Sequence, residues 1–347
     1  MKEKRLDFEV LRLIAIFGVV FNHSQERGFE LYMVQNVSPV NYCASLLLGI
    51  LCKISVPLFF MVSGGLLLHR EEPLSAVLKK RASRILIALI LFSGILYLFW
   101  IRWGYVDPSP LDFIKRLWSE GISAPYWYLY AYLGAMLMLP LLRPLARNMS
   151  DTTFQYMIGL YVILFGVAAA VGTLTDWGPF NESLTKMLLI PELFYFLLGY
   201  YLVHRYSWDK MDGKHLLILW VLASASVIIM FILADVSIRR GGMSGIGYHN
   251  GWMLFPVLAV YATVRMLFAT QKTPGRLSRV LVSLGGCVFG TYLMEGMLRH
   301  ALGPVYQALE PRIHVLPACI VWVVLVVFCG LAITWVLKRI PIVKKIF

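Results

Sequence analysis

Long apolar runs are the feature that most constrains how this chain can fold. Ten such runs can be marked, and each is long enough to cross the roughly 30 Å hydrocarbon core of a bilayer as a helix. Of the 347 residues, 59% are hydrophobic and only 15% are charged, whereas soluble domains carry roughly 25% charged residues. The sequence therefore predicts an all-α integral membrane protein, with little chain left for a soluble catalytic domain.

The predicted spans form a single bundle of about ten transmembrane helices, which we treat as one domain covering residues 1–347. Their approximate limits are 6–24, 40–68, 84–101, 126–142, 154–173, 187–203, 215–234, 250–270, 282–300 and 315–337. The segment between the third and fourth spans, residues 102–125, carries tryptophans and prolines. We expect it to lie on the membrane interface as a short amphipathic element.

The distribution of basic residues predicts the orientation of the bundle. The net charge of +13 does not come from a polar segment that interleaves basic and aromatic residues, so we expect no nucleic-acid partner. If both termini are cytoplasmic, the inner segments hold 20 of the 32 basic residues and the outer segments hold 8. This excess follows the positive-inside rule, and it predicts a multi-pass membrane protein with both termini cytoplasmic.

The cysteines give no pattern that is typical of a metal site. All five lie in apolar runs, and none has CxxC spacing. We interpret them as small core residues and expect neither a disulfide framework nor a metal ion. These residues are Cys43, Cys52, Cys287, Cys319 and Cys329.

The first span carries charged groups that a membrane helix does not need. Arg12 and His23 are 11 positions apart, which places them within roughly 20° of the same helix face. Glu9 precedes Arg12 by three residues and can pair with it on the helix surface. One interpretation is such a pair together with a solvated histidine at the outer boundary. The alternative is a site in which His23 takes a proton from a hydroxyl and Arg12 stabilises negative charge.

Two further segments carry candidate residues. Arg81 and Arg84 are three positions apart at a cytoplasmic mouth, where they could bind the phosphates of a nucleotide-like donor. The alternative is an ordinary positive-inside loop. The second span contains Lys53, Pro57 and a Ser63-Gly64-Gly65 turn, which predicts a broken helix that lines a cavity or packs within protein.

Several signatures of soluble enzymes are missing. The chain has no GxSxG, P-loop or HExxH motif. The fifth residue after His23 is Gly28, so the HxxxxD motif of glycerolipid acyltransferases is also missing. The histidine of the first span is therefore the main catalytic candidate.

Five motifs in order resemble one family. The first is the run from Arg12 to His23, which is similar to the Arg-x10-His first helix of the acyltransferase-three family of bacterial integral-membrane O-acyltransferases, with Glu9 at that family's acidic position. The others are Lys53-x3-Pro57-Leu-Phe-Phe-Met-Val-Ser63-Gly64, Arg81-x-x-Arg84, Pro125-Tyr-Trp127-Tyr128-Leu129 with Leu139-Pro140-Leu-Leu, and Phe289-Gly290-Thr-Tyr292-Leu293-Met-Glu295. The matches run from residue 5 to about residue 298.

The chain departs from the family pattern in two motifs. Gly65 replaces the tyrosine of the common Ser-Gly-Tyr, and Glu295 replaces a late histidine. We do not transfer that histidine's role. Glu295 could bind a polar acceptor or neutralise a cation, and the alternative is an ordinary pair with Arg299 one turn on. The chain is interpreted as a stand-alone member without an appended esterase-like domain.

The resemblance implies acyl transfer across the membrane. It implies an acyl-coenzyme A donor, with acetyl-coenzyme A favoured, that binds from the cytoplasm without a metal. Its phosphates would lie near Arg81 and Arg84, and we count Lys53, Ser63 and Gly64 among the donor-binding residues. His23 would act as general base, or carry the acyl group covalently, and Arg12 would steady His23 or the donor.

The implied acceptor is a hydroxyl on an extracytoplasmic or lipid-linked glycan, as in polysaccharide modification of the cell envelope. Trp127 and Tyr128 could stack on a sugar, although an interface aromatic belt gives the same pattern. Tyr248 and His249 could contact the acceptor, with a solvated loop as the alternative. Tyr292 and Glu295 complete the acceptor candidates.

Two interpretations from other functional classes remain open at the sequence level. A secondary transporter or flippase would use the buried Arg, His and Glu groups as a proton relay. It predicts an internal repeat, but the Arg-x10-His helix has no second copy, and it gives no reason for Arg81-x-x-Arg84. The second of these interpretations is a non-catalytic exporter of small molecules. The sequence leaves open the acceptor, the choice between acetyl and a larger acyl group, and the oligomeric state.

Overall fold

The computed structural model divides the chain into two compact units built from distant parts of the sequence. It describes residues 5–119, 121–175, 177–178, 180–181, 183–185, 190–242, 247–269, 275–344 and 346. Unit 1 comprises residues 1–69 and 145–285, and unit 2 comprises residues 70–144 and 286–347. Across the described part of the chain the regular elements are helices without any strand, which confirms the predicted all-α class. The single-domain interpretation stays a prediction beside this division.

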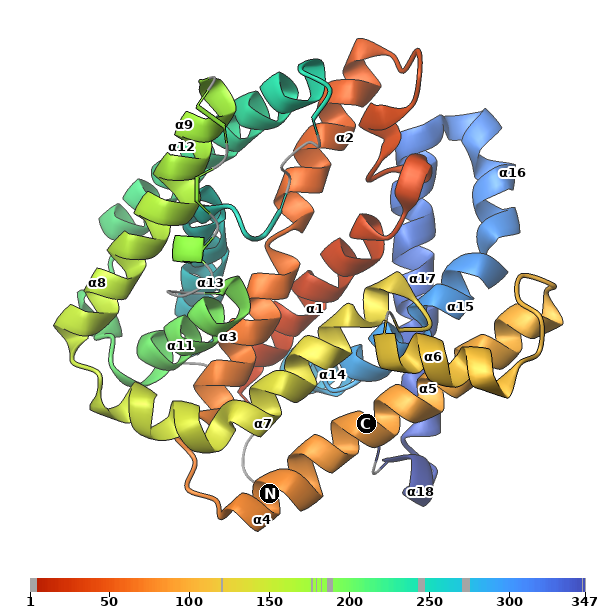
Figure 1. Ribbon diagram of the computed structural model, residues 1–347, viewed down its shortest axis with the longest axis horizontal. Helices are drawn as coiled ribbons and strands as arrows, with labels where there is room; N and C mark the ends of the chain where they lie inside the picture. Colours follow the sequence, from red (N-terminus) through yellow and green to blue (C-terminus); the bar gives the residue numbers. More distant parts are fainter. Residues whose placement is uncertain are drawn as a thin grey trace. The chain divides into compact units, whose positions relative to one another are not determined.

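Unit 1 holds the charged first helix and most of the helices that follow residue 150 (Figure 1). Its elements are α1 (Leu6–Asn22), η1 (Gln25–Arg27), η2 (Leu31–Met33), α2 (Pro39–Cys52), α3 (Ser55–Leu67), α8 (Asp151–Tyr161), the π-helix η5 (Val162–Val167), α9 (Ala168–Leu174), α11 (Pro191–His204), η6 (Trp208–Lys210), α12 (Gly213–Arg239), η7 (Gly251–Met253), α13 (Leu254–Phe268) and α14 (Arg276–Gly285).

Unit 2 combines the helices before residue 145 with the C-terminal helices. Its elements are α4 (Leu74–Ala76), the π-helix η3 (Val77–Ala82), α5 (Ser83–Arg102), α6 (Pro110–Ser119), η4 (Ala124–Tyr126), α7 (Trp127–Asn148, whose last four residues belong to unit 1), α15 (Val288–Ala301), α16 (Gly303–Ile313), α17 (Val315–Leu337) and α18 (Pro341–Lys344).

Several helices are long and apolar enough to cross a membrane, so the chain is a multi-pass membrane protein. Among the described residues there are seven such segments, or up to eight if α14 and α15 form one bent span. The predicted count of about ten is not confirmed. Helix α1 has only 17 residues and carries Asp7, Glu9 and Arg12. Helix α11 has 14 residues, and the predicted span 187–203 begins at positions outside the described residues.

The second span is broken, but not where the sequence predicted. The break lies at Lys53 and Ile54, between α2 and α3. Pro57 lies in the first turn of α3, where a backbone N–H has no acceptor within the helix. The missing N–H of proline therefore removes no helical hydrogen bond. The predicted Ser63-Gly64-Gly65 turn is wrong, because these residues continue α3 as regular helix.

Glycines allow α3 and α11 to pack at very short range. A Cβ atom on Gly64 would overlap the carbonyl oxygen of Phe196, and a Cβ atom on Gly199 would overlap the carbonyl oxygen of Met61. Small residues at a membrane helix crossing let the two backbones approach in this way. The sequence signal read as a turn is therefore a helix-packing surface.

The segment between α5 and α7 contains the expected amphipathic helix. Helix α6 presents Leu111, Ile114 and Trp118 as exposed apolar side chains, and Trp118 is 89% exposed. Its polar side holds Asp112, which accepts a hydrogen bond from Arg116 at 2.8 Å. This pattern suits a helix that lies in a membrane interface.

Within the described part of the chain the five cysteines form no disulfide bond, and they differ in burial. Cys287 and Cys319 are buried, in agreement with their interpretation as core residues, and Cys52 and Cys329 are half-buried. Cys43 is exposed on α2, so the prediction of a core position is wrong for this residue. A surface cysteine on an apolar helix is compatible with contact to lipid, which does not require its burial in protein.

The crossing of α3 and α11 gives a test of the fold. Gly199→Ala forces a methyl group against the backbone of α3, and overpacking of this kind costs about 1–3 kcal/mol. We expect detergent-purified Gly199→Ala to lose its monodisperse peak at a clearly lower temperature than the wild type. Gly159→Ala in α8 is the matched control, because a Cβ atom there meets open space. Equal thermal resistance of Gly199→Ala and the wild type would contradict the close packing.

Candidate functional site

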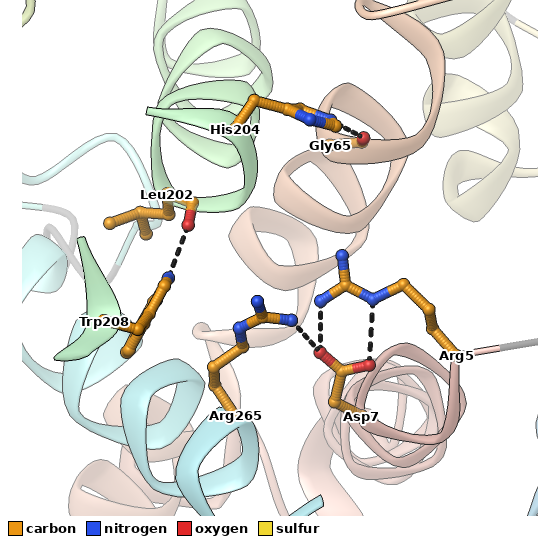
Figure 2. Close-up of polar contacts among 7 residues, drawn as sticks. All are labelled: Arg5, Asp7, Gly65, Leu202, His204, Trp208 and Arg265. Carbon is orange, nitrogen blue, oxygen red and sulfur yellow. Dashed lines mark hydrogen bonds and ion pairs between the residues drawn. The ribbon is translucent and has the colours of Figure 1, made fainter. Parts of the chain in front are cut away.

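A buried carboxylate holds the start of α1 against the end of α13. Asp7 is 1% exposed, and it receives hydrogen bonds from Nε and Nη2 of Arg5 at 3.2 and 2.5 Å. Nη1 of Arg265 donates to the same carboxylate at 2.9 Å (Figure 2). A buried charge is tolerated only when it is paired in this way, so the two arginines fix this helix end.

The ends of α3 and α11 lie in the same part of unit 1. Nε2 of His204 lies 2.8 Å from the carbonyl oxygen of Gly65. The indole N–H of Trp208 donates to the carbonyl oxygen of Leu202 at 2.6 Å, and Arg265 lies 5.6 Å from the centre of the Trp208 ring. Figure 2 shows these contacts in one view with the Asp7 carboxylate and its two arginines. We call this set of helix ends the Asp7 end of unit 1.

The other end of α1 is tied to the break in the second span. The side-chain amide of Asn22 donates to the carbonyl oxygen of Cys52 at 3.1 Å, and Ser55 Oγ donates to the same oxygen at 2.7 Å. Gly18 packs so closely that a Cβ atom there would overlap Ser55 Oγ. The carbonyl that the break releases from the helix ladder is therefore satisfied by side chains of α1 and α3.

His23 follows Asn22 and caps the C-terminus of α1. It is half-buried, and its backbone N–H lies 3.2 Å from the carbonyl oxygen of Val19. The adjacent bond between Asn22 and Cys52 holds the backbone of His23 beside the helix break. We call the region around His23 and Lys53 the His23 end of unit 1.

Lys53 brings a cation to the His23 end. Its Nζ lies 4.3 Å from the centre of the Phe29 ring, and the Phe29 backbone N–H donates to Ser24 Oγ at 2.8 Å. Ser24 directly follows His23, so Lys53 is held against the segment that leaves α1. A cation beside a candidate base can stabilise an oxyanion formed during acyl transfer.

A second polar group lies at the start of α11 and just before η7. The hydroxyl of Tyr248 donates to Glu192 Oε1 at 2.5 Å, and the Tyr248 and His249 ring centres are 3.9 Å apart. Burial, followed by this hydrogen bond to Glu192, raises the pKa of Tyr248. Shielding of His249 from water by the surrounding protein lowers its pKa, as does the charge of Lys53, while the charge of Glu192 opposes the shift. The mutual influence of these charges places Glu192, His249 and Lys53 in one neighbourhood.

Tyr248 and His249 could be predicted as candidates from the sequence, but Glu192 could not. The available signal was an isolated acid directly after Pro191, at the head of an apolar run. Nothing in the sequence links this acid to Tyr248, which lies 56 positions away.

The predicted pair on α1 is confirmed. Nη1 of Arg12 donates to Glu9 Oε1 at 2.9 Å, with the Glu9 side chain 5% exposed and the Arg12 side chain 28% exposed. Gly285 at the end of α14 packs directly against Glu9, where a Cβ atom would come within 2.6 Å of Oε2. The pair thus anchors α1 to α14, and Arg12 keeps part of its guanidinium accessible.

In unit 2, Arg81 is held by a carboxylate that the sequence analysis did not name. Glu72 accepts two hydrogen bonds from Arg81, one of them from Nε at 2.6 Å, and a further one from Arg143 Nη2 at 2.8 Å. Arg84 instead donates through Nε to the carbonyl oxygen of Ile346 at 3.0 Å. The two arginines of the predicted phosphate pair therefore have different partners. The positive charge of Arg81 is partly neutralised by Glu72, which is shared with Arg143.

The remaining donor candidates of the second span are packed inside unit 1. Ser63 is 8% exposed, and Gly64 lies against the backbone of α11. Their position shows a packing role, and contact with a donor stays a prediction.

The aromatic acceptor candidates gather in unit 2. The Tyr128 and Tyr292 ring centres are 5.7 Å apart, and the Tyr292 hydroxyl donates to the carbonyl oxygen of Pro125. Trp127 is 37% exposed beside Tyr128. Tyr292 is 6% exposed, so it belongs to the interior of this unit.

Glu295 has the neighbouring arginine that the sequence suggested. It is 1% exposed, and Arg299 Nε donates to its Oε2 at 2.5 Å. This ion pair joins residues one helical turn apart and neutralises the buried acid.

The candidate residues divide between the units. The catalytic candidates and one acceptor candidate belong to unit 1, and the arginine pair and most acceptor candidates belong to unit 2. Unit 1 holds Glu9, Arg12, His23, Lys53, Ser63, Gly64 and Tyr248; unit 2 holds Arg81, Arg84, Trp127, Tyr128, Tyr292 and Glu295. Within the described chain, no group of three or more His, Cys, Asp or Glu side chains could hold a metal ion.

Comparison with known proteins identifies the class. A family model described as an acyltransferase domain matches residues 5–339, which is nearly the whole chain. With its apolar helices, the protein is therefore a membrane acyltransferase. The chain belongs to the acyltransferase-three family. No curated protein and no solved structure gives a significant match.

The Glu72 ion pairs predict a pH-dependent contribution to stability. Hydrogen bonds from Arg81 first, and from Arg143 as well, lower the pKa of Glu72 from 4.5 to about 2, against the opposing effect of burial. Because the pKa is lowered on folding, this stabilisation is full above pH 4.5 and is lost as pH falls towards 2. Glu72→Gln should lower the free energy of unfolding by about 1–3 kcal/mol at pH 7.

Thermal unfolding of the wild type and Glu72→Gln in detergent between pH 7 and pH 3 measures this effect. The difference in midpoint should narrow as pH falls below 4.5. The exposed pair of Asp112 and Arg116 supplies the control, and Asp112→Asn should change the midpoint little at any pH. A pH-independent difference for Glu72→Gln would contradict the assignment.

Proposed function

We propose that this membrane acyltransferase moves an acyl group, with acetyl favoured, from cytoplasmic acyl-coenzyme A to a hydroxyl of an extracytoplasmic or lipid-linked glycan. In this proposal it acts in the inner (plasma) membrane with both termini in the cytoplasm. The observation that carries the proposal is the position of His23, beside a helix break that presents Lys53, in a chain of the acyltransferase-three family.

His23 acts as the general base. Its imidazole takes the proton of the acceptor hydroxyl as the oxygen attacks the thioester carbonyl carbon. The carbon–sulfur bond then breaks, and the coenzyme A thiolate recovers the proton from the imidazolium. The ammonium of Lys53 stabilises the negative carbonyl oxygen formed between these steps. The products are an O-acyl ester and free coenzyme A.

The pair of Glu9 and Arg12 supports this chemistry from within α1. Arg12 lies three helical turns before His23, close to the same face of the helix. Glu9 restrains one side of the guanidinium, and the accessible remainder is available to the donor. Arginine suits this role because its donors are fixed in a plane and its charge does not depend on pH near neutrality.

The donor phosphates bind to Arg81 and Arg84, and the acceptor contacts the aromatic candidates Trp127, Tyr128 and Tyr292 together with Glu295. Glu72 supports the first part of this assignment because it holds Arg81 in one orientation through two hydrogen bonds. A guanidinium that is already oriented loses less conformational freedom when it binds a phosphate.

Removal of the histidine tests the proposed base. His23→Ala should lower coenzyme A release from acetyl-coenzyme A by about 10²-fold or more, in membranes that supply the acceptor, because general-base catalysis typically contributes 10²–10⁴-fold. The control is His215→Ala, since His215 is an exposed residue paired with Asp212 at the start of α12. Turnover by His23→Ala at the wild-type rate, with both proteins folded, would exclude His23 as the base.

Binding of the donor tests the arginine pair. Arg81→Ala/Arg84→Ala should weaken the binding of acetyl-coenzyme A to purified protein by about tenfold or more, because hydrogen bonds to charged groups contribute about 1.5–3 kcal/mol each. Arg116→Ala removes an exposed arginine of α6 and serves as the control. Undiminished affinity of the double variant would place the donor phosphates elsewhere.

A further inference from the structure

We propose that Glu192, Tyr248 and His249 form a binding site in unit 1 for adjacent hydroxyl groups of a sugar acceptor. This inference rests on the proposed function, because it names the part of the acyl-transfer site that takes the acceptor. It also specifies the substrate class as a polyol rather than an isolated alcohol.

Contacts within unit 1 bring these residues to the His23 end. The start of α1 and the ends of α3, α11 and α13 are joined at the Asp7 end. The opposite ends of the same helices carry His23, Lys53, Glu192 and the segment 247–250 before η7. These helices have only 13–17 residues, which corresponds to roughly 20–26 Å. The candidate acceptor residues and the candidate base are therefore on the same side of unit 1.

Two other helices, α2 and α12, meet beyond the His23 end. The hydroxyl of Tyr42 in α2 donates to Asp235 Oδ1 in α12 at 2.7 Å. Tyr42 lies ten positions before Cys52, and this separation corresponds to about 15 Å along a helix. The His23 end therefore lies about 15 Å along α2 from the joined tips of α2 and α12.

The carboxylate of Glu192 is only partly used by the protein. Oε1 accepts the hydrogen bond from Tyr248, and no described residue donates a hydrogen bond to Oε2. Glu192 is half-buried, whereas Tyr248 is 8% exposed. A partly shielded carboxylate oxygen is a strong acceptor for the hydroxyl groups of a sugar.

The segment that carries Tyr248 and His249 is held in place by its backbone. The hydroxyl of Tyr161 lies 3.5 Å from the carbonyl oxygens of both residues, and the Tyr161 ring stacks on Phe194 with centres 3.7 Å apart. Gly251 packs directly on the backbone of Gly166, which leaves no room for a side chain. The site is therefore built before any ligand binds, which lowers the entropic cost of binding.

His249 supplies the complementary donor and acceptor. The side chain is exposed, yet shielding by the protein and the charge of Lys53 lower its pKa. A neutral imidazole at pH 7 offers one N–H donor and one acceptor nitrogen. Glu192 and His249 can thus bind two neighbouring hydroxyl groups of one sugar, while Lys53 and His23 act on the third group that reacts.

A purely structural interpretation explains less of this arrangement. It accounts for the bond between Glu192 and Tyr248, because a buried hydroxyl needs a partner. It gives no reason for an exposed His249 and a half-buried Lys53 at the same helix ends as Glu192.

The experiment measures transfer of radioactive label from acetyl-coenzyme A to the glycan fraction of membranes. The membranes come from the cells in which the protein is made. Glu192→Gln keeps the size of the side chain and removes its charge, and Tyr248→Phe removes the hydroxyl. Each should lower labelling by about tenfold or more while acetyl-coenzyme A binding to the purified protein is unchanged. Tyr42→Phe is the matched control, because it removes the equivalent Tyr–carboxylate bond outside the site and should label like the wild type.

The substrate class is tested in the same assay. Treatment of the acceptor membranes with periodate, which cleaves adjacent diols, followed by quenching and addition of untreated enzyme, should abolish labelling. Wild-type labelling by Glu192→Gln and Tyr248→Phe would overturn the site, and labelling that resists periodate would overturn the polyol class. If the wild type neither binds acetyl-coenzyme A nor transfers label, the proposed function fails as well, and that outcome is distinct from the other two.

Discussion

The buried carboxylate of Asp7 is the constraint on which the arrangement of unit 1 depends. A carboxylate that is 1% exposed in an apolar unit is stable only with compensating charge, and it receives that charge from Arg5 of its own segment and Arg265 of α13. This fixes which ends of α1 and α13 meet. The opposite end of α1 is then locked by the bond from Asn22 to Cys52, at the point where the second span breaks. His23, Lys53 and the Glu192 group share one end of the unit as a result.

Local features of the fold could be predicted from the sequence because local interactions determine them. The helical class follows from the apolar runs, and the pair of Glu9 and Arg12 follows from a spacing of three on one helix. The amphipathic helix α6 follows from apolar residues that recur every three or four positions. The pair of Glu295 and Arg299 belongs to the same category, because the partners are one turn apart.

Features that depend on distant residues could not be predicted in this way. The Ser63-Gly64-Gly65 sequence is typical of a turn when it is read alone, but the partner that requires Gly64 is Phe196 of α11. Glu72 and Arg143 are 71 positions apart, and Glu192 and Tyr248 are 56 apart. No periodicity in the sequence links such pairs. Only the folded chain shows that Glu72 lies beside Arg81, a predicted donor-binding residue, and that Glu192 lies beside Tyr248, a predicted acceptor-binding residue. The family, by contrast, was recognisable because its motifs are short and keep their order.

We infer that acyl transfer takes place at the His23 end of unit 1. Cryo-electron microscopy of the purified protein with a non-hydrolysable thioether analogue of acetyl-coenzyme A tests this inference, because the map shows where the acyl end lies. We expect the acyl carbonyl beside the imidazole of His23 and the ammonium of Lys53. An analogue whose acyl end contacts neither His23 nor Lys53 would show that transfer takes place elsewhere.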